Sequence, residues 1–189
     1  FGSYLGVNTI INNQGNLSAV GARKCISSAK KYITLIAGLL SAYIVHIICL
    51  GVNLLYLIFV LRIDFGDKIP QIVLTTVIGG FAGIAMGFFI GSIGKISTNA
   101  KLGILTSISL ILCFFSGLMA HNMRMKVENI FPVLNKISPA ALIADSFHSL
   151  NIYGVSERFY TNIITLIIIS VIFTIGGLIL TRRDSYANL

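Results

Sequence analysis

The sequence predicts an all-α, polytopic membrane protein with four full membrane-spanning helices and one re-entrant helical hairpin. Of its 189 residues, 56% are hydrophobic and only 11% are charged. Soluble domains carry about 25% charged residues, so this composition excludes an ordinary soluble fold. Four apolar runs are long enough to cross a bilayer. Between the third and fourth runs lie about forty residues that neither cross a bilayer nor are plainly soluble, and these predict the hairpin.

The first 32 residues contain an apolar segment followed by a polar connector. Residues 1–11 are apolar but too short to span, and we expect them to be the end of a truncated membrane helix in the C-terminal part of a longer protein. Residues 12–32 follow as a connector whose charges are all basic: Arg23, Lys24, Lys30 and Lys31. Because loops on the cytoplasmic side carry an excess of lysine and arginine, we expect this connector to be cytoplasmic. Asn16 or Ser18 could cap a short helix that lies along the membrane and docks a partner protein.

The transmembrane domain is predicted to occupy residues 33–189. Its four spans are expected at 33–61, 69–94, 102–120 and 160–180. The first would be about 43 Å long, so it should tilt or project beyond the hydrocarbon. His46 within it is either a proton-handling group or, more commonly for a lone histidine, a neutral residue bonded to a neighbouring helix. The three cysteines suit free thiols better than a disulfide framework or a metal site: Cys25, Cys49 and Cys113.

Glycine recurs at every fourth residue of the second span. The four positions are Gly79, Gly83, Gly87 and Gly91. This spacing places a strip without side chains along one helix face, which lets another backbone approach closely. We therefore predict that the strip serves helix packing and could let helices stay close while they shift. A conduit or a hinge lined by the strip is the alternative.

The outer hairpin is expected at about residues 121–158. In residues 123–135, one helical face carries Val127, Ile130, Phe131 and Leu134. Ser138 followed by Pro139 has the pattern of an N-cap and a first-turn proline, so a second helix should begin there and run to about Leu150. One face of that helix carries Ala140, Ile143, Ala144, Phe147 and Leu150. Two short helices joined near residues 136–138 fit an interfacial or re-entrant hairpin.

The basic connectors predict the orientation in the membrane. With four crossings, the segments that hold Arg23 and Lys24, Lys95 and Lys101, and Arg182 and Arg183 all fall on one side. They contain a single acidic residue, whereas the opposite connectors mix both signs of charge. We therefore expect a multi-pass protein of the cell membrane whose N-terminal connector and C-terminus are cytoplasmic and whose hairpin is outside.

Several chemistries find no support in the sequence. The expected spans contain no charged residue, which argues against an ion-coupled carrier. There is no G-x-x-x-x-G-K-[ST] loop to hold ATP phosphates, and no aromatic-interleaved basic patch for nucleic acid. An intramembrane hydrolase would have only Ser116 and His46 as its pair, without a supporting motif. His121 and His148 are too isolated for a metal site. We expect no enzyme activity and no cofactor on this chain.

Short motifs in a fixed order run through nearly the whole chain. They comprise the basic connector GARKCISSAKKYI, the span end Phe114-Phe115-Ser116-Gly117-Leu118-Met119, and then Phe131-Pro132, Ile137-Ser138-Pro139-Ala140 and Asp145-Ser146-Phe147. In this order and spacing the chain resembles the membrane subunit of an ABC-2 type transporter, a permease of the exporter kind with a type V exporter-like domain. In that family the span ending in Ser116 and Gly117 would lead into the outer re-entrant hairpin, which contains Pro132 and Pro139.

The resemblance implies a mechanism and partners. A separate cytosolic ABC ATPase would bind ATP, and its closure would push on a coupling helix that here includes Arg23, Lys24 and Ile26. Two permease subunits, identical or different, would pair in the lipid bilayer and export an amphipathic substrate. The chain would hold the end of the second span and the third to sixth spans of such a subunit.

Three other classes of function stay open at this stage. A non-transporting membrane anchor or sensor would share the topology but would need no ATPase, so a neighbouring gene for an ATPase would discriminate. An ion-coupled carrier would need a charged residue in the first spans, which we expect to be missing from this sequence. An intramembrane hydrolase would be revived by covalent labelling of Ser116.

Overall fold

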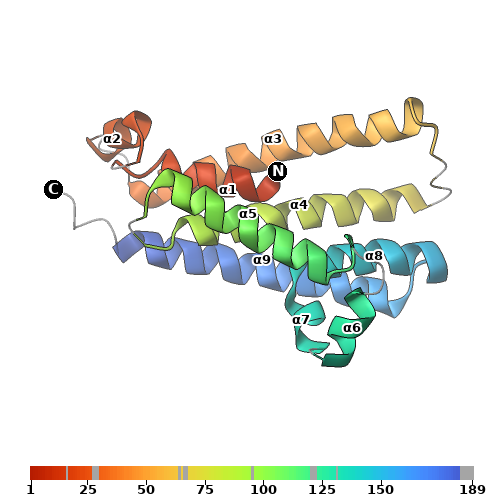
Figure 1. Cartoon of the computed structure of the whole chain (residues 1–189). Coiled ribbons are helices and arrows are strands. Elements are labelled where there is room, and N and C mark those ends of the chain that lie inside the picture. The colour runs from red at the N-terminus through yellow and green to blue at the C-terminus, as the bar shows by residue number, and fades with distance from the viewer. Residues whose placement is uncertain are drawn as a thin grey trace. The chain divides into compact units, whose positions relative to one another are not determined.

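The chain is built from helices throughout its described part. The computed structural model describes residues 1–15, 17–26, 30–63, 65, 68–94, 96–119, 123–130 and 132–183. No strand occurs in these residues, which confirms the all-α class. The helices, labelled in Figure 1, are α1 (Gly2–Ile11), α2 (Ala19–Ile26), α3 (Lys31–Phe59), α4 (Ile69–Gly91), α5 (Thr98–Phe115), α6 (Met123–Ile130), α7 (Pro132–Ile137), α8 (Pro139–Tyr153) and α9 (Glu157–Arg183).

Four of the described helices are long and apolar enough to cross a membrane: α3, α4, α5 and residues Glu157–Thr181 of α9. They correspond to the four predicted spans, but α5 and α9 begin three or four residues earlier than the apolar runs do. A helix continues past an apolar run because its backbone hydrogen bonds do not depend on the side chains. The expectation that no span holds a charge therefore needs correction at the helix starts, which include Lys31, Lys101, Glu157 and Arg158.

The chain forms two compact units, and each long helix contributes to both. Unit 1 comprises residues 1–46, 83–106 and those from Ser170 on. Unit 2 comprises residues 47–82 and 107–169. Unit 1 thus contains α1, α2 and the helix ends next to the basic connectors, whereas unit 2 contains the hairpin helices α6, α7 and α8.

In unit 1, α1 packs directly on the glycine face of α4. A Cβ atom at Gly87 would lie 2.6 Å from the carbonyl carbon of Ser3, and one at Gly91 would lie 3.2 Å from Cα of Val7. At Gly83 the nearest atom would be the Ser3 nitrogen, at 3.7 Å. Three of the four glycines therefore face the backbone of α1. Beside this contact lies an apolar cluster of Ile10, Leu35, Phe88, Leu39 and Leu178.

In unit 2, α8 lies alongside the first half of α4. The Nζ atom of Lys68 donates to the carbonyl of Leu150 at 2.8 Å, and a Cβ atom at Gly79 would lie 3.0 Å from the side chain of Ile143. Lys68, just before α4, and Gly79 within it are about 16 Å apart at the rise of a helix. α8 therefore accompanies α4 over part of its length, and the re-entrant placement of the hairpin in a bilayer stays a prediction. An apolar cluster completes the packing, with Leu150, Phe159, Ile163, Ile72 and Ile78.

The hairpin differs from the expected pair of helices at Pro132. The sequence predicts one helix over residues 123–135, but the structure has α6 ending at Ile130 and α7 beginning at Pro132. Proline has no N–H to donate and disfavours a helical conformation at the preceding residue, so it begins a helix more readily than it continues one. The cap before α8 is as predicted: the Ser138 hydroxyl accepts the N–H of Ala141, and Pro139 occupies the first turn.

The buried side of α8 includes polar residues. Asp145, Ser146 and Ser149 are buried together with Leu150, whereas Phe147 from the apolar face named above is exposed. Apolar side chains can face lipid at no cost, but polar groups need partners inside the protein. The apolar face of α8 is therefore divided: Leu150 is buried and Ile143 packs at Gly79, whereas Phe147 is exposed.

Candidate functional site

The start of α2 is fastened to the end of α1. The Ser18 hydroxyl accepts the N–H of Gly21 at 2.9 Å and donates to the carbonyl of Ile11 at 2.9 Å. Ser18 thus caps α2, which confirms that prediction; Asn16, the alternative cap, lies outside the described residues. The double role of Ser18 fixes the angle at which α2 leaves α1.

One side of α2 is seated against the residues that follow α1. Gly21 is buried, and a Cβ atom there would lie 2.6 Å from the carbonyl carbon of Gln14, so a larger residue would push α2 outward. The Nζ atom of Lys24 donates to Oδ1 of Asn13 at 3.4 Å. Lys24 therefore belongs to the seated side of the helix.

The opposite side of α2 is open to solvent. Val20 is 52% exposed, Ile26 is 88% exposed and Arg23 is also exposed. We call these three residues the α2 outer face; their spacing of three residues places them on one side of the helix. The predicted coupling residues are therefore divided: Arg23 and Ile26 are on the outer face and Lys24 is not.

The seated side of α2 connects to the spans through Gln14. The Leu17 and Ser18 N–H groups donate to the Gln14 carbonyl at 3.1 and 3.3 Å. The side-chain oxygen of Gln14 accepts from Nζ of Lys101, at the start of α5, at 3.1 Å. Lys101 also donates to the carbonyl of Gly91, the last residue of α4, at 2.5 Å. Gln14 and Lys101 therefore join the residues beneath α2 to the end of α4 and the start of α5.

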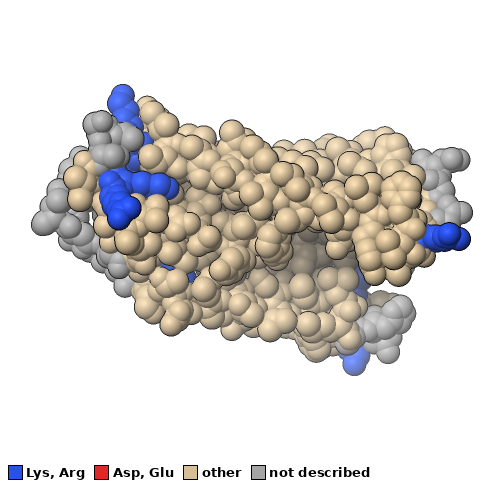
Figure 2. Space-filling view, turned by 90° about the horizontal axis from the view of Figure 1, so that it is seen from above, with Lys and Arg blue, Asp and Glu red and all other residues tan. Residues whose placement is uncertain are grey.

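Further bonds join the other helix ends in unit 1. Lys31, at the start of α3, donates to the carbonyl of Thr181 near the end of α9 at 3.0 Å. The Thr181 hydroxyl donates to that of Ser92 at 3.0 Å. Hydrogen bonds thus join described residues next to the basic connectors within unit 1. In Figure 2 the lysine and arginine side chains lie in several separate places on the face in view. Lys95 lies outside the described residues.

The sequence did not identify Lys101 as a structural residue. A basic connector suggests exposed lysines that set the orientation of the protein in the membrane. In the structure Lys101 is fully buried. The Ser97 hydroxyl accepts the N–H of Ala100 at 3.4 Å, which starts α5 ahead of the apolar run. Ser97 as an N-cap is the sequence signal that could have placed Lys101 inside the helix.

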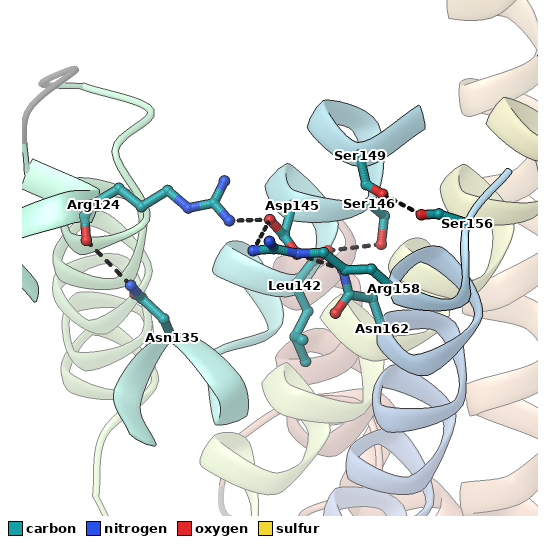
Figure 3. A network of polar contacts seen from close by, with 9 residues as sticks. All are labelled: Arg124, Asn135, Leu142, Asp145, Ser146, Ser149, Ser156, Arg158 and Asn162. Atoms are coloured by element: carbon teal, nitrogen blue, oxygen red, sulfur yellow. Dashed lines mark hydrogen bonds and ion pairs between the residues drawn. The ribbon is translucent and has the colours of Figure 1, made fainter. Parts of the chain in front are cut away.

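Unit 2 contains a second polar site, centred on Asp145 of α8. Arg158 binds this carboxylate with two hydrogen bonds, from Nε at 2.8 Å and from Nη2 at 3.0 Å. Asn162 donates to Oδ2 at 2.7 Å, and Arg124 of α6 forms an ion pair with Oδ1. Figure 3 shows these donors converging on Asp145 from two sides. One carboxylate therefore joins α6, α8 and the first turns of α9.

The charge state of Asp145 follows from its surroundings. Burial raises the pKa of the carboxyl group, but hydrogen bonds from Arg158, Arg124 and Asn162 lower it by more, so its pKa is below the ordinary value for aspartate. Asp145 is ionised at neutral pH. The sequence pointed to it only within the motif Asp145-Ser146-Phe147; Arg158 and Asn162, spaced by one helical turn, were its unrecognised partners.

The remaining residues singled out from the sequence have local roles. Ser116 is buried and donates to the Cys113 carbonyl at 2.8 Å. Gly117 follows with a φ of +83°, a conformation that favours glycine where α5 ends. His46 belongs to unit 1, where its ring stacks on Phe1 with centroids 5.7 Å apart. His121 lies outside the described residues, in which no three potential metal ligands form a group.

Comparison with known families decides the class. The sequence model of a family described as ABC-2 family transporter protein matches residues 1–179. The chain belongs to this ABC-2 family. The match extends from α1 almost to the end of α9 and so includes the hairpin, the first three candidate spans and the fourth up to residue 179. No curated protein and no solved structure matches the chain.

Membership of the ABC-2 family makes the chain a membrane-spanning permease of an ABC transporter. Such a permease is the transport component and is not itself catalytic. The family also implies association with an ABC ATPase. The α2 outer face and the Asp145 site are therefore to be understood as parts of a transport subunit.

Proposed function

We propose that this ABC-2 permease exports an amphipathic substrate with energy from ATP hydrolysed on a separate cytosolic subunit, and that this ATPase docks on the α2 outer face. The observation that carries the proposal is the exposed Ile26 beside Arg23 on a helix whose other side is fixed. A large exposed apolar residue flanked by arginine is typical of the central residues of protein interfaces.

The seating of α2 supports a role in force transfer. If α2 were attached only by its flanking chain, a push from a partner would be absorbed by movement of the connector. Here Gly21 rests on the Gln14 backbone, and Gln14 is bonded to Lys101. A displacement of α2 therefore has to displace Gln14 and the helix ends bonded to it.

The basic residues support the orientation. The helix ends gathered in unit 1 carry Arg23, Lys24, Lys31 and Lys101. Because lysine and arginine are enriched on the cytoplasmic side, this end would face the cytoplasm of a cell-membrane permease and could meet a cytosolic ATPase. The hairpin would then be on the outer side.

A second permease subunit completes the proposed transporter. In the most apolar part of α3 only 17% of residues are buried, so this helix offers most of its surface to lipid or to another subunit. We propose pairing with a second permease, identical or different, since alternating access needs two halves that move against each other.

Acidic residues in place of the basic and apolar residues of the α2 outer face should prevent the ATPase from binding. We expect the double variant Arg23→Glu and Ile26→Asp to lower the amount of ATPase that co-purifies with the full-length permease by at least about tenfold, because losing interface anchors of this kind costs about 2 kcal/mol or more. The measurement is the ratio of the two subunits after co-expression with the nearest encoded ABC ATPase and purification in lipid.

The matched control is Lys126→Glu with Ile130→Asp on α6. Both residues are exposed, and the control makes the same chemical changes on the predicted outer side. It should leave the subunit ratio unchanged. Retention of ATPase by the α2 variant would contradict the docking site, and failure of the unaltered permease to bind any ATPase would favour the anchor or sensor function.

A further inference from the structure

Lys101 is a fully buried cation in the first turn of α5. A buried ammonium group is costly unless oxygen atoms surround it, and a side chain such as methionine would fill much of the same space without that cost. Buried charges of this kind are best explained where their directional bonds fix one arrangement of the surrounding elements. The arrangement around Lys101 is therefore informative.

The ammonium group of Lys101 joins the residues that support α2 to two spans. On one side, the ammonium group is bonded to the side chain of Gln14. The Gln14 carbonyl accepts two N–H groups just ahead of α2, and the Gln14 backbone supports Gly21. The Gly91 carbonyl on the other side is at the C-terminal end of α4, where helix carbonyls carry partial negative charge and attract cations. Lys101 itself belongs to α5.

Other lysines bonded to carbonyls do not combine these features. Lys68 donates to the Leu150 carbonyl in unit 2, and Lys31 donates to the Thr181 carbonyl in unit 1, but both are only half-buried. The bonds of these two lysines do not run to Gln14, which supports α2. Among these three lysines, Lys101 is the one that bonds both to a helix end and to Gln14, the residue that supports α2.

We propose that Lys101 is a positioning residue that makes α2, the end of α4 and the start of α5 move as one body. It would transmit the movement of the docked ATPase to the spans, and in this respect the inference rests on the proposed function. The mechanical tie itself is a property of the permease alone. The tie can therefore be tested with or without an ATPase.

The test measures the distance between α2 and α5 with two spin labels. The labels are placed by Ala22→Cys and Gly103→Cys in a background where Cys25, Cys49 and Cys113 are serine. Ala22 is off the α2 outer face, and a Cβ atom at Gly103 meets nothing within 4 Å. Pulsed electron paramagnetic resonance then gives the distance distribution for the full-length permease in lipid, alone and with the ATPase trapped by ATP and vanadate.

With Lys101 present we expect a single narrow distance that stays the same in both states. Lys101→Met should abolish the narrow peak in the permease alone and should make the distance depend on vanadate trapping in the complex, while the ATPase stays bound. Gln14→Leu, which removes one partner, should act in the same direction. Lys101→Arg, which keeps the charge and the donors, should restore the narrow peak.

Lys68→Met is the matched control, since it removes a lysine bonded to a helix carbonyl elsewhere, and it should not change the distance. A narrow, unchanged peak in both Lys101→Met and Gln14→Leu would overturn the proposal. If Lys101→Met cannot be purified, the result for Gln14→Leu decides. If no ATPase binds the unaltered permease, the proposed function fails, but the measurement on the permease alone still decides whether Lys101 ties α2 to α5.

Discussion

Replacing Gly87 by alanine should prevent α1 from packing on α4 and should sharply lower the yield of folded permease. The new Cβ atom would lie 2.6 Å from the carbonyl carbon and 2.7 Å from Cα of Ser3. These are backbone atoms of α1, so no rotation of a side chain can relieve the overlap. Overpacking of a well-packed core costs about 1–3 kcal/mol or more, and here it also separates α1 from the apolar cluster around Phe88.

Gly83→Ala is the matched control for this prediction. Gly83 lies one helical turn earlier on the same face, and its Cβ atom would meet Ser3 only at an ordinary contact distance of 3.7 Å. Alanine should be neutral there or should stabilise α4 by about 0.5–1 kcal/mol, because it loses less backbone entropy than glycine.

The measurement for both variants is thermal unfolding of the full-length protein, followed by fluorescence-detected size exclusion. If the unfolding temperature is lower for Gly87→Ala but not for Gly83→Ala, close packing is the role of the strip. Equal transitions for both variants would contradict the contact between α1 and α4. Normal folding of Gly87→Ala with loss of transport would instead favour the hinge.

Removing the charge of Asp145 should loosen the hairpin of unit 2. Asp145→Asn keeps the size of the side chain but leaves the guanidinium groups of Arg124 and Arg158 without their shared counter-charge (Figure 3). Hydrogen bonds to charged groups contribute about 1.5–3 kcal/mol each, and the exposure of Arg158 reduces its share. We expect a loss of about 2–3 kcal/mol in the free energy of unfolding.

The control for Asp145→Asn is Glu128→Gln, because Glu128 is an exposed carboxylate on α6. Substitutions at exposed sites of this kind change stability by about 0.5 kcal/mol or less. Thermal unfolding in lipid compares the two variants. An equally small effect of both would mean that Asp145 does not hold the hairpin together.

The same site should make stability depend on pH in the acidic range. Because the pKa of Asp145 is lowered in the folded state, its contribution is complete above the unfolded pKa of about 4 and is lost as the pH falls through the lower folded value. The unfolding temperature of the unaltered protein should therefore decrease when the pH is lowered below about 4. Asp145→Asn should lack this part of the dependence, and parallel pH curves would contradict the assignment.

The large features of the fold could be predicted because the bilayer imposes them on the sequence. Apolar runs of membrane length give α3, α4, α5 and α9, and Ser138 with Pro139 gives the start of α8. The glycine spacing indicated a close contact of α4, although it did not identify α1 as the partner of three of the glycines.

The polar sites could not be predicted in the same way. Lys101 and Asp145 find their partners on helices distant in sequence, and a single sequence gives no pairing between such residues. The same limitation explains Lys24: it is basic like Arg23, but only the packing of Gly21 on Gln14 reveals that Lys24 points toward Asn13. Local periodicity reports which residues share a face but not which face is buried.

Cross-linking at the α2 outer face tests the central claim most directly. A photoreactive phenylalanine derivative is placed at Ile26, or at Ile130 of α6 as a control of similar exposure, in the full-length permease co-expressed with its ATPase. On illumination, the probe at Ile26 should link the permease covalently to the ATPase, and the probe at Ile130 should not. Efficient cross-linking from Ile130, or none from Ile26 in a complex that co-purifies, would contradict docking on α2.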